Sequence, residues 1–274
     1  MTVCHLLPSI LMKYLLHLAY NGTRFSGWQR QVNTSNTIQE NIEVQISKLA
    51  GENIRLHGCG RTDKGVHAEQ YFANFSMPKK PENWVYKLNK MVDSDIKIHS
   101  ITSVDEKFNA RFDAISRTYR YFFHNNKDPF INEISAYYPK LLNVSTHFEA
   151  LRESLEQNRE FSGFCKSPNS HDNTLCKIYA VHLFQNEKTG RYCIEITANR
   201  FLRGMIRILM HYFLEICSNT FTSEEYLEIL NSGKNPHEVQ FAYPQGLFLC
   251  HIKYQNIDIK PIEKVSFALL KELS

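Results

Sequence analysis

The sequence lacks the patterns that mark disulfide-rich, zinc-ribbon and membrane-spanning proteins. Its seven cysteines are odd in number and scattered, and no two form a CxxC pair, so neither a disulfide framework nor a zinc ribbon is indicated. This use of cysteine favours a reducing compartment, and we expect a cytoplasmic protein. No apolar run approaches the ~18 residues of a membrane span. Residues 1–20 lack the basic start and small-residue cleavage site of a signal peptide.

An excess of charge of one sign is also missing. The chain of 274 residues carries 32 Lys and Arg against 28 Asp and Glu, a net charge of +4. That small excess permits a polyanionic partner without requiring one. Hydrophobic residues make up 43% and charged residues 22%, which is ordinary for a globular protein. The length allows one large domain or two small ones.

Short strands alternate with amphipathic helices, which predicts an α+β fold of two similar units joined near residues 105–115. The predicted strands cover residues 13–20, 69–77, 95–104, 116–125, 174–185, 192–199 and 246–254. The predicted helices cover residues 37–51, 82–92, 145–157, 201–217 and 223–232. Thr37 and Glu40 have the spacing of a capping box, and Gly51 stands where a helix is expected to end.

The helix predicted over 201–217 is strongly apolar. On a helix through this region, Arg200, Arg203 and Arg207 would share one face. A solvated position explains Arg200 and Arg203, whereas an arginine inside so apolar a helix needs a partner. We therefore expect Arg207 to meet a charged or polar group.

Residues 57–70, HGCGRTDKGVHAEQ, concentrate polar side chains among three glycines and allow three interpretations. Cys59, Asp63 and His67 recur every four residues and would line up as metal ligands on a helix. The glycines disfavour a helix there, since each costs about 1 kcal/mol. Cys59 and His67 could instead act as thiol nucleophile and base. The third interpretation makes Asp63 the reactive group.

The residues TDKG (62–65) have the composition of a tight turn, with Asp63 near its start and Gly65 where a positive φ is favoured. Such a turn would present the carboxylate, with Arg61 as a possible charge partner. An ordinary aspartate that caps a turn explains the same residues equally well.

Four segments resemble the tRNA pseudouridine synthase I (TruA) family, and they span nearly the whole chain. The segment GRTDKGVHA (60–68) is very similar to the family signature, and the other three match in order: LAYNGTRFSGWQRQ (18–31), FNARFDAISRTYRYF (108–122) and ANRFLRGMIRIL (198–209). The chain departs from the family at Asn21, at Arg159-Glu160, at His211 and in AYPQGL (242–247). None of these departures touches the signature.

The resemblance implies the pseudouridine synthase fold, in which two α+β domains join their antiparallel sheets into one central sheet. Helices pack outside, and the catalytic cleft lies between the domains. It also implies a homodimer that converts uridine to pseudouridine in the anticodon arm of tRNA (family positions 38–40), with no cofactor and no metal. Asp63 matches the catalytic carboxylate, Arg61 the arginine beside it, Tyr119 a tyrosine that stacks on the target uracil, and Arg207 an arginine that pairs with the carboxylate.

Recognition of tRNA is expected to depend on shape and backbone charge. The target uridine must leave its stack, at a cost of a few kcal/mol, and stacking on Tyr119 would return ~1–3 kcal/mol. The expected phosphate contacts are Arg24, Arg30, Lys64 and Arg111, which lie in or near the matched segments.

The expected organisation is an N-terminal extension (1–12), an N-terminal domain (13–108) that carries Asp63, and a C-terminal domain (109–274). Because the resemblance implies that the opening strand of the family starts at Lys13, removal of residues 1–11 is expected to leave activity intact. Two other functions stay open. One is a non-catalytic tRNA-binding or chaperone protein on the same fold, and the other is a hydrolase that uses Cys59 and His67.

Overall fold

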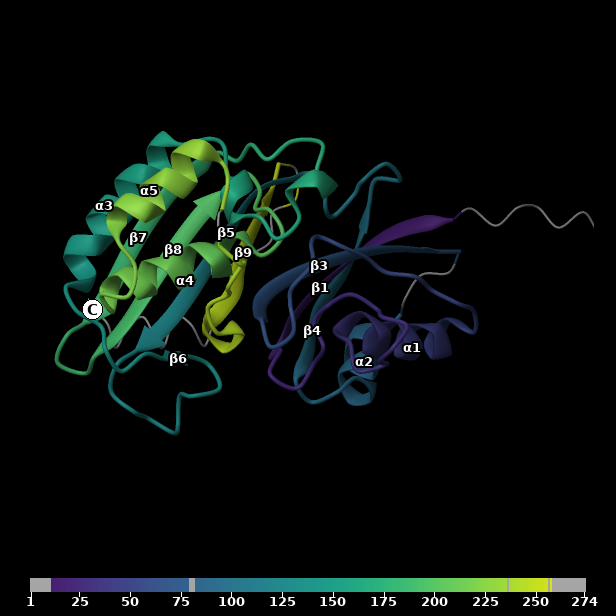
Figure 1. Cartoon of the computed structure of the whole chain (residues 1–274). Coiled ribbons are helices and arrows are strands. Elements are labelled where there is room, and N and C mark those ends of the chain that lie inside the picture. The colour runs from purple at the N-terminus through teal and green to yellow at the C-terminus, as the bar shows by residue number, and fades with distance from the viewer. Residues whose placement is uncertain (1–10, 79–81, 236, 256, 258–274) are drawn as a thin grey trace, which may run out of the picture.

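The computed structural model describes residues 11–78, 82–235, 237–255 and 257. Within these residues nine strands form one sheet, whose main order is β4-β1-β3-β9-β5-β8-β7. Two short strands lie off this order, since β2 (His57–Gly58) pairs with β3 and β6 (Ala136–Tyr137) pairs with β5. The sheet runs through the whole molecule (Figure 1), so the predicted single central sheet is confirmed.

The N-terminal half contains the antiparallel strands β1 (Met12–Tyr20), β3 (His67–Met77) and β4 (Ile96–Val104). Helices α1 (Ile38–Ala50) and α2 (Trp84–Met91) pack together beside these strands (Figure 1). The apolar stripe of α1 is fully buried at Ile38, Ile42 and Ile46. This half therefore has a core of its own.

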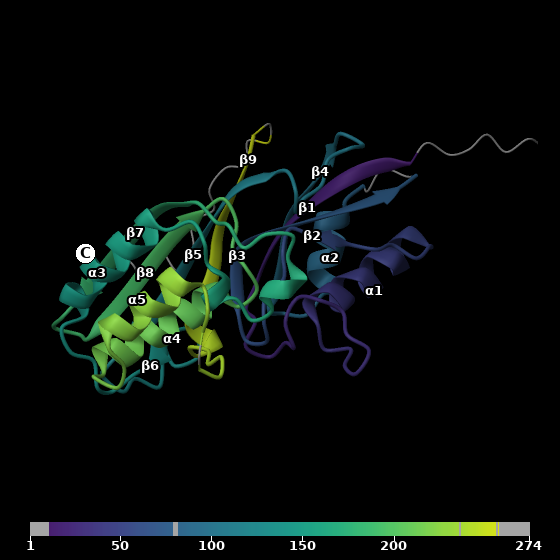
Figure 2. The ribbon, with the colours of Figure 1, turned by 45° about the horizontal axis from the view of Figure 1, so that its top comes forward.

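The C-terminal half contains β5 (Ala114–His124), β7 (Ile178–Asn186), β8 (Arg191–Ala198) and β9 (Leu247–Tyr254). Helices α3 (Val144–Gln157), α4 (Met205–Cys217) and α5 (Ser223–Ser232) lie together against it (Figure 2). Most of α4 is buried, as its composition predicts. No helix of the described residues is long and apolar enough to cross a membrane.

The two halves meet at a short parallel pairing between β3 and β9. His67 pairs with Phe248 and Ala68 with Leu249. The buried side chain of Gln70 extends the junction, since its Oε1 accepts a hydrogen bond from the backbone N–H of Ile252 at 2.8 Å. Apart from the short parallel pair of β5 and β6, the strands are antiparallel within each half, whereas the junction itself is parallel.

The start of α1 confirms one half of the predicted capping box. The Thr37 hydroxyl accepts a hydrogen bond from the Glu40 N–H at 3.3 Å, and the Gly51 N–H closes the helix on Ser47 O at 3.0 Å. The Glu40 carboxylate does not return to Thr37 and pairs with Arg30 at 3.0 Å. The ion pair with Arg30 thus takes the place of the hydrogen bond from the Thr37 N–H to Glu40 that would complete the capping box.

The predicted start of α4 is wrong. The helix begins at Met205 because Gly204 adopts a left-handed conformation, with φ of 73°. Arg200 and Arg203 therefore precede the helix and share no helical face with Arg207. Only Arg207 projects from the helix itself.

The expected domain boundary between residues 108 and 109 stays a prediction, and it falls in the segment between β4 and β5. Of the expected N-terminal extension, residues 1–10 lie outside the described residues, and Met12 is the first residue of β1.

Candidate active site

Asp63 stands at the start of the turn that its sequence predicts. Its carbonyl accepts a hydrogen bond from the Val66 N–H at 3.2 Å, and Gly65 has a φ of 78°. That conformation is one that glycine adopts without strain. A Cβ on Gly65 would lie 3.0 Å from the ring of Pro244, so the turn packs closely on a segment of the other half. The Asp63 side chain is thereby placed at the boundary between the halves.

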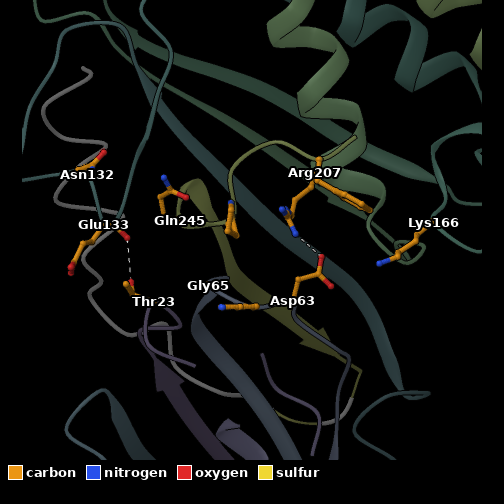
Figure 3. A pocket seen from close by; sticks show the side chains of 11 residues that line it. Thr23, Asp63, Gly65, Asn132, Glu133, Lys166, Arg207 and Gln245 are labelled. Atoms are coloured by element: carbon orange, nitrogen blue, oxygen red, sulfur yellow. Dashed lines mark hydrogen bonds and ion pairs between the residues drawn. The ribbon is translucent and has the colours of Figure 1, made fainter. Parts of the chain in front are cut away.

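Arg207 of α4 pairs with Asp63 across this boundary. Its Nη1 lies 2.9 Å from Asp63 Oδ2 (Figure 3). Its Nε donates to the carbonyl of Ala242 at 2.9 Å. The Arg207 side chain is 15% exposed and that of Asp63 is 42% exposed. Asp63 Oδ1 accepts no hydrogen bond from the described residues, so one carboxylate oxygen has no protein partner there. The expected partner of Arg207 is therefore the proposed catalytic carboxylate.

A cavity of about 630 Å³ opens over this ion pair and takes residues from both halves (Figure 3). Besides Asp63, Lys64 and Arg207, its lining includes side chains that the sequence analysis missed: Thr23, Asn132, Glu133, Lys166, Phe241 and Gln245. The segments that supply them are widely spaced in the chain, and only the fold brings them together. Lys166 lies on the Arg207 side of the cavity, opposite Glu133 and Thr23 (Figure 3).

Tyr119 on β5 is half-buried and contacts the apolar cores of both halves. Its ring meets that of Phe201 edge-on, with centroids 5.2 Å apart. Burial raises the pKa of the Tyr119 hydroxyl, and the charge of Asp63 adds to this effect. The hydroxyl is therefore neutral at working pH. Tyr119 does not line the cavity itself, so its expected role as a base support stays a prediction.

Two of the four expected phosphate contacts are already paired with carboxylates. Arg24 lies 2.8 Å from Asp93 and 2.6 Å from Asp95, and Arg30 pairs with two glutamates of α1 at 3.0 and 3.4 Å. These partners neutralise much of the charge that would attract RNA. Arg24 and Arg30 thus form surface ion pairs, and their expected role as phosphate contacts stays a prediction.

Arg61, Lys64 and Arg111 are exposed, and none has a carboxylate partner in the part of the chain that the structure describes. The expected pairing of Arg61 with Asp63 is not formed in the described residues, and the partner of the Asp63 carboxylate is Arg207. Arg111 lies over the exposed ring of Phe112, 5.3 Å from its centroid. These three cations remain available to a polyanion.

The thiol interpretation of Cys59 and His67 is wrong. Cys59 is 1% exposed, and burial raises the pKa of its thiol to about 11, so it is not a thiolate at neutral pH. Its backbone N–H bonds to Phe72 O at 2.8 Å, five residues along β3 from His67. No hydrogen bond joins the two side chains in the described residues.

Within those residues, no three His, Cys, Asp or Glu side chains lie close enough together to hold a metal ion.

Comparison with known proteins agrees with this geometry. A family model described as tRNA pseudouridine synthase matches residues 17–113 and 155–255. The tRNA pseudouridine synthase A of Porphyromonas gingivalis is 31% identical over 252 residues, which cover 89% of this chain and 98% of that protein. The enzyme of the same name from Chlorobium chlorochromatii is 32% identical over 87% of this chain and 98% of its own. The tRNA pseudouridine synthase A 2 of Bacillus cereus is 32% identical over 88% of this chain and 99% of its own. The chain therefore belongs to the tRNA pseudouridine synthase family.

Proposed function

We propose that this protein isomerises uridine to pseudouridine in tRNA. The reaction breaks the C1′–N1 glycosidic bond, turns the uracil and forms a C1′–C5 bond, so substrate and product contain the same atoms. The observation that carries the proposal is the Asp63–Arg207 ion pair under a cavity shared by both halves. Family membership supplies the substrate class.

Asp63 is the proposed catalytic carboxylate, acting either as a covalent nucleophile or by stabilising developing positive charge. Asp63 lines the cavity, and its Oδ2 is held by Arg207 while Oδ1 accepts no hydrogen bond from the described residues. A carboxylate that a guanidinium already orients needs no rearrangement when substrate arrives. Arg207 thus holds the Asp63 carboxylate in a fixed orientation, and fixing the orientation of a catalytic group accelerates a reaction.

Arg61 and Tyr119 are proposed to act on the extruded nucleotide. Arg61 is exposed two residues before Asp63, where it can fill the space that the departing base leaves. Tyr119 lies near enough to Asp63 for the two to interact electrostatically, which supports a role for its ring beside the flipped base. Lys64 and Arg111 are the proposed phosphate contacts, because their charges are not neutralised by carboxylates of the described residues.

The finer features carried over from the family resemblance belong to the same proposal. The target uridines would lie in the anticodon stem-loop, and the protein would act as a homodimer in the cytoplasm. The net charge of +4 is compatible with an RNA partner.

The test is to incubate the pure protein with unmodified tRNA transcripts and to map pseudouridine in the product. Asp63→Asn serves as the matched control, since it keeps the shape of the side chain and removes its charge. Wild-type product that is absent from the control supports the proposal. Binding of tRNA without any product by the wild type would instead support the non-catalytic RNA-binding alternative.

A further inference from the structure

One short segment, 241–245, connects both members of the ion pair. At one end, Ala242 and Arg207 exchange two hydrogen bonds: Ala242 N–H donates to Arg207 O at 2.9 Å, and Arg207 Nε donates to Ala242 O at 2.9 Å. At the other end, the ring of Pro244 packs on Gly65, in the turn that presents Asp63. The segment therefore reaches from the guanidinium to the carboxylate turn.

The aromatic ring of Phe241 adds a contact that these hydrogen bonds do not provide. The guanidinium carbon of Arg207 lies over this ring, 5.0 Å from its centroid, and Lys166 Nζ lies 5.4 Å from the same centroid. Cations at such distances are attracted by the negative face of an aromatic ring. Phe241 is half-buried in the lining of the cavity, so solvent weakens this attraction only partly.

The start of α4 leaves room for this ring. A Cβ on Gly204 would lie 2.7 Å from Phe241 Cε1, closer than side chains approach one another. The same glycine has the positive φ that begins the helix. Ring, helix start and guanidinium therefore fit one another closely.

We propose that Phe241 is a positioning residue for the reaction: its ring holds the Arg207 guanidinium in the orientation that meets Asp63. The face of a planar guanidinium stacks on the ring, while its N–H donors remain free to bind in the plane. In this orientation Nε donates to Ala242 O and Nη1 donates to Asp63 Oδ2. Without the ring, the guanidinium keeps its charge and loses a constraint on its rotation. This proposal rests on the proposed function.

The principal test compares Phe241→Leu with Phe241→Tyr. The leucine variant is apolar and lacks the ring, so single-turnover pseudouridine formation should fall about 3- to 30-fold while tRNA affinity is unchanged. The tyrosine variant keeps the ring and should recover the wild-type rate. Tyr243→Leu is the matched control, because Tyr243 lies in the same segment, is 54% exposed and does not line the cavity.

Two further variants separate the possible routes of the effect. In an Arg207→Gln background, Phe241→Leu should cause no additional loss of rate, because the group that it positions is gone. Additive losses would overturn the proposal, as would equal losses of rate and tRNA affinity in Phe241→Leu. If Lys166→Met alone reproduced the rate loss of Phe241→Leu, the ring would be acting through the lysine, and the proposal would fail.

A spectroscopic measurement distinguishes failure of this proposal from failure of the proposed function. The NMR signal of the Arg207 Nε–H can be identified because it is lost in Arg207→Gln. This signal reports on the guanidinium whether or not any pseudouridine forms. Its exchange with solvent should be faster in Phe241→Leu and return to the wild-type rate in Phe241→Tyr. Equal exchange in all three proteins would show that the ring does not restrain Arg207.

Discussion

Protonation of His67 should weaken the junction between the two halves of the sheet. His67 is 2% exposed and stacks on Phe248 with centroids 4.4 Å apart. Its Nδ1 accepts from the Gly22 N–H at 3.2 Å, so Nε2 carries the proton and donates to Gln245 O at 3.1 Å. Burial lowers its pKa from 6.5 to about 4. The neutral ring thus joins three segments, and a second proton would remove the bond to Gly22.

The magnitude follows from proton linkage. Because the folded pKa of His67 is lowered, the unfolded chain binds more protons between about pH 4 and pH 6.5. The free energy of unfolding is therefore unaffected by His67 above pH 7 and falls as the pH is lowered through this window. The loss from this one side chain is about 2 kcal/mol at pH 5 and about 3 kcal/mol at pH 4.

The assay is urea denaturation of the wild type and of His67→Gln at several pH values from 7 to 4. Glutamine keeps one acceptor and one donor and does not titrate, so the other histidines and the carboxylates contribute equally to both proteins. The wild type should lose about 2 kcal/mol more than the variant between pH 7 and pH 5. Parallel pH dependence of the two proteins would refute the reasoning.

Three other variants test the site. Asp63→Asn should abolish pseudouridine formation, retain tRNA binding and change the free energy of unfolding by no more than about 1 kcal/mol, because its ion pair is partly exposed; single-turnover kinetics and denaturation measure both effects. Tyr119→Ala should slow single turnover far more than it weakens tRNA binding, whereas equal losses with a lower melting temperature would indicate a packing role alone. Cys59→Ala should leave turnover unchanged, and loss of turnover in a folded variant would reopen the thiol interpretation.

Local patterns predicted most of the fold because strands and helices carry their own periodicity. Every strand and helix expected from the sequence is present, with shifts at the ends. The start of α4 was misplaced because the apolar pattern continues through Gly204, and only the left-handed backbone there shows where the helix begins. The parallel junction of β3 and β9 was not predicted, since it depends on two strands far apart in the chain.

The residues of the candidate site likewise fall into two groups, those that a local sequence motif marked and those that only the fold brings together. Asp63 and Arg207 were found through local motifs, and the structure brings them within 2.9 Å of each other. Lys166 and Phe241 had no such signal, because an isolated lysine and an isolated phenylalanine are ordinary residues until folding places them at one cavity. Departure from the family pattern next to Phe241, at AYPQGL (242–247), is the only feature of the sequence that marked this region.

The position of β9 between β3 and β5 has a consequence for the nascent protein. Among the described strands β9 leaves the ribosome last, yet it fills the middle of the sheet. Until residues 247–254 emerge, one edge of β5 and the start of β3 at His67 and Ala68 lack their partner strand, and such edges invite pairing with other chains. Asp63 and Arg207 are synthesised before β9, but the two halves that carry them are joined only when β9 has been synthesised. Completion of the sheet and assembly of the site are thus a single late event in synthesis.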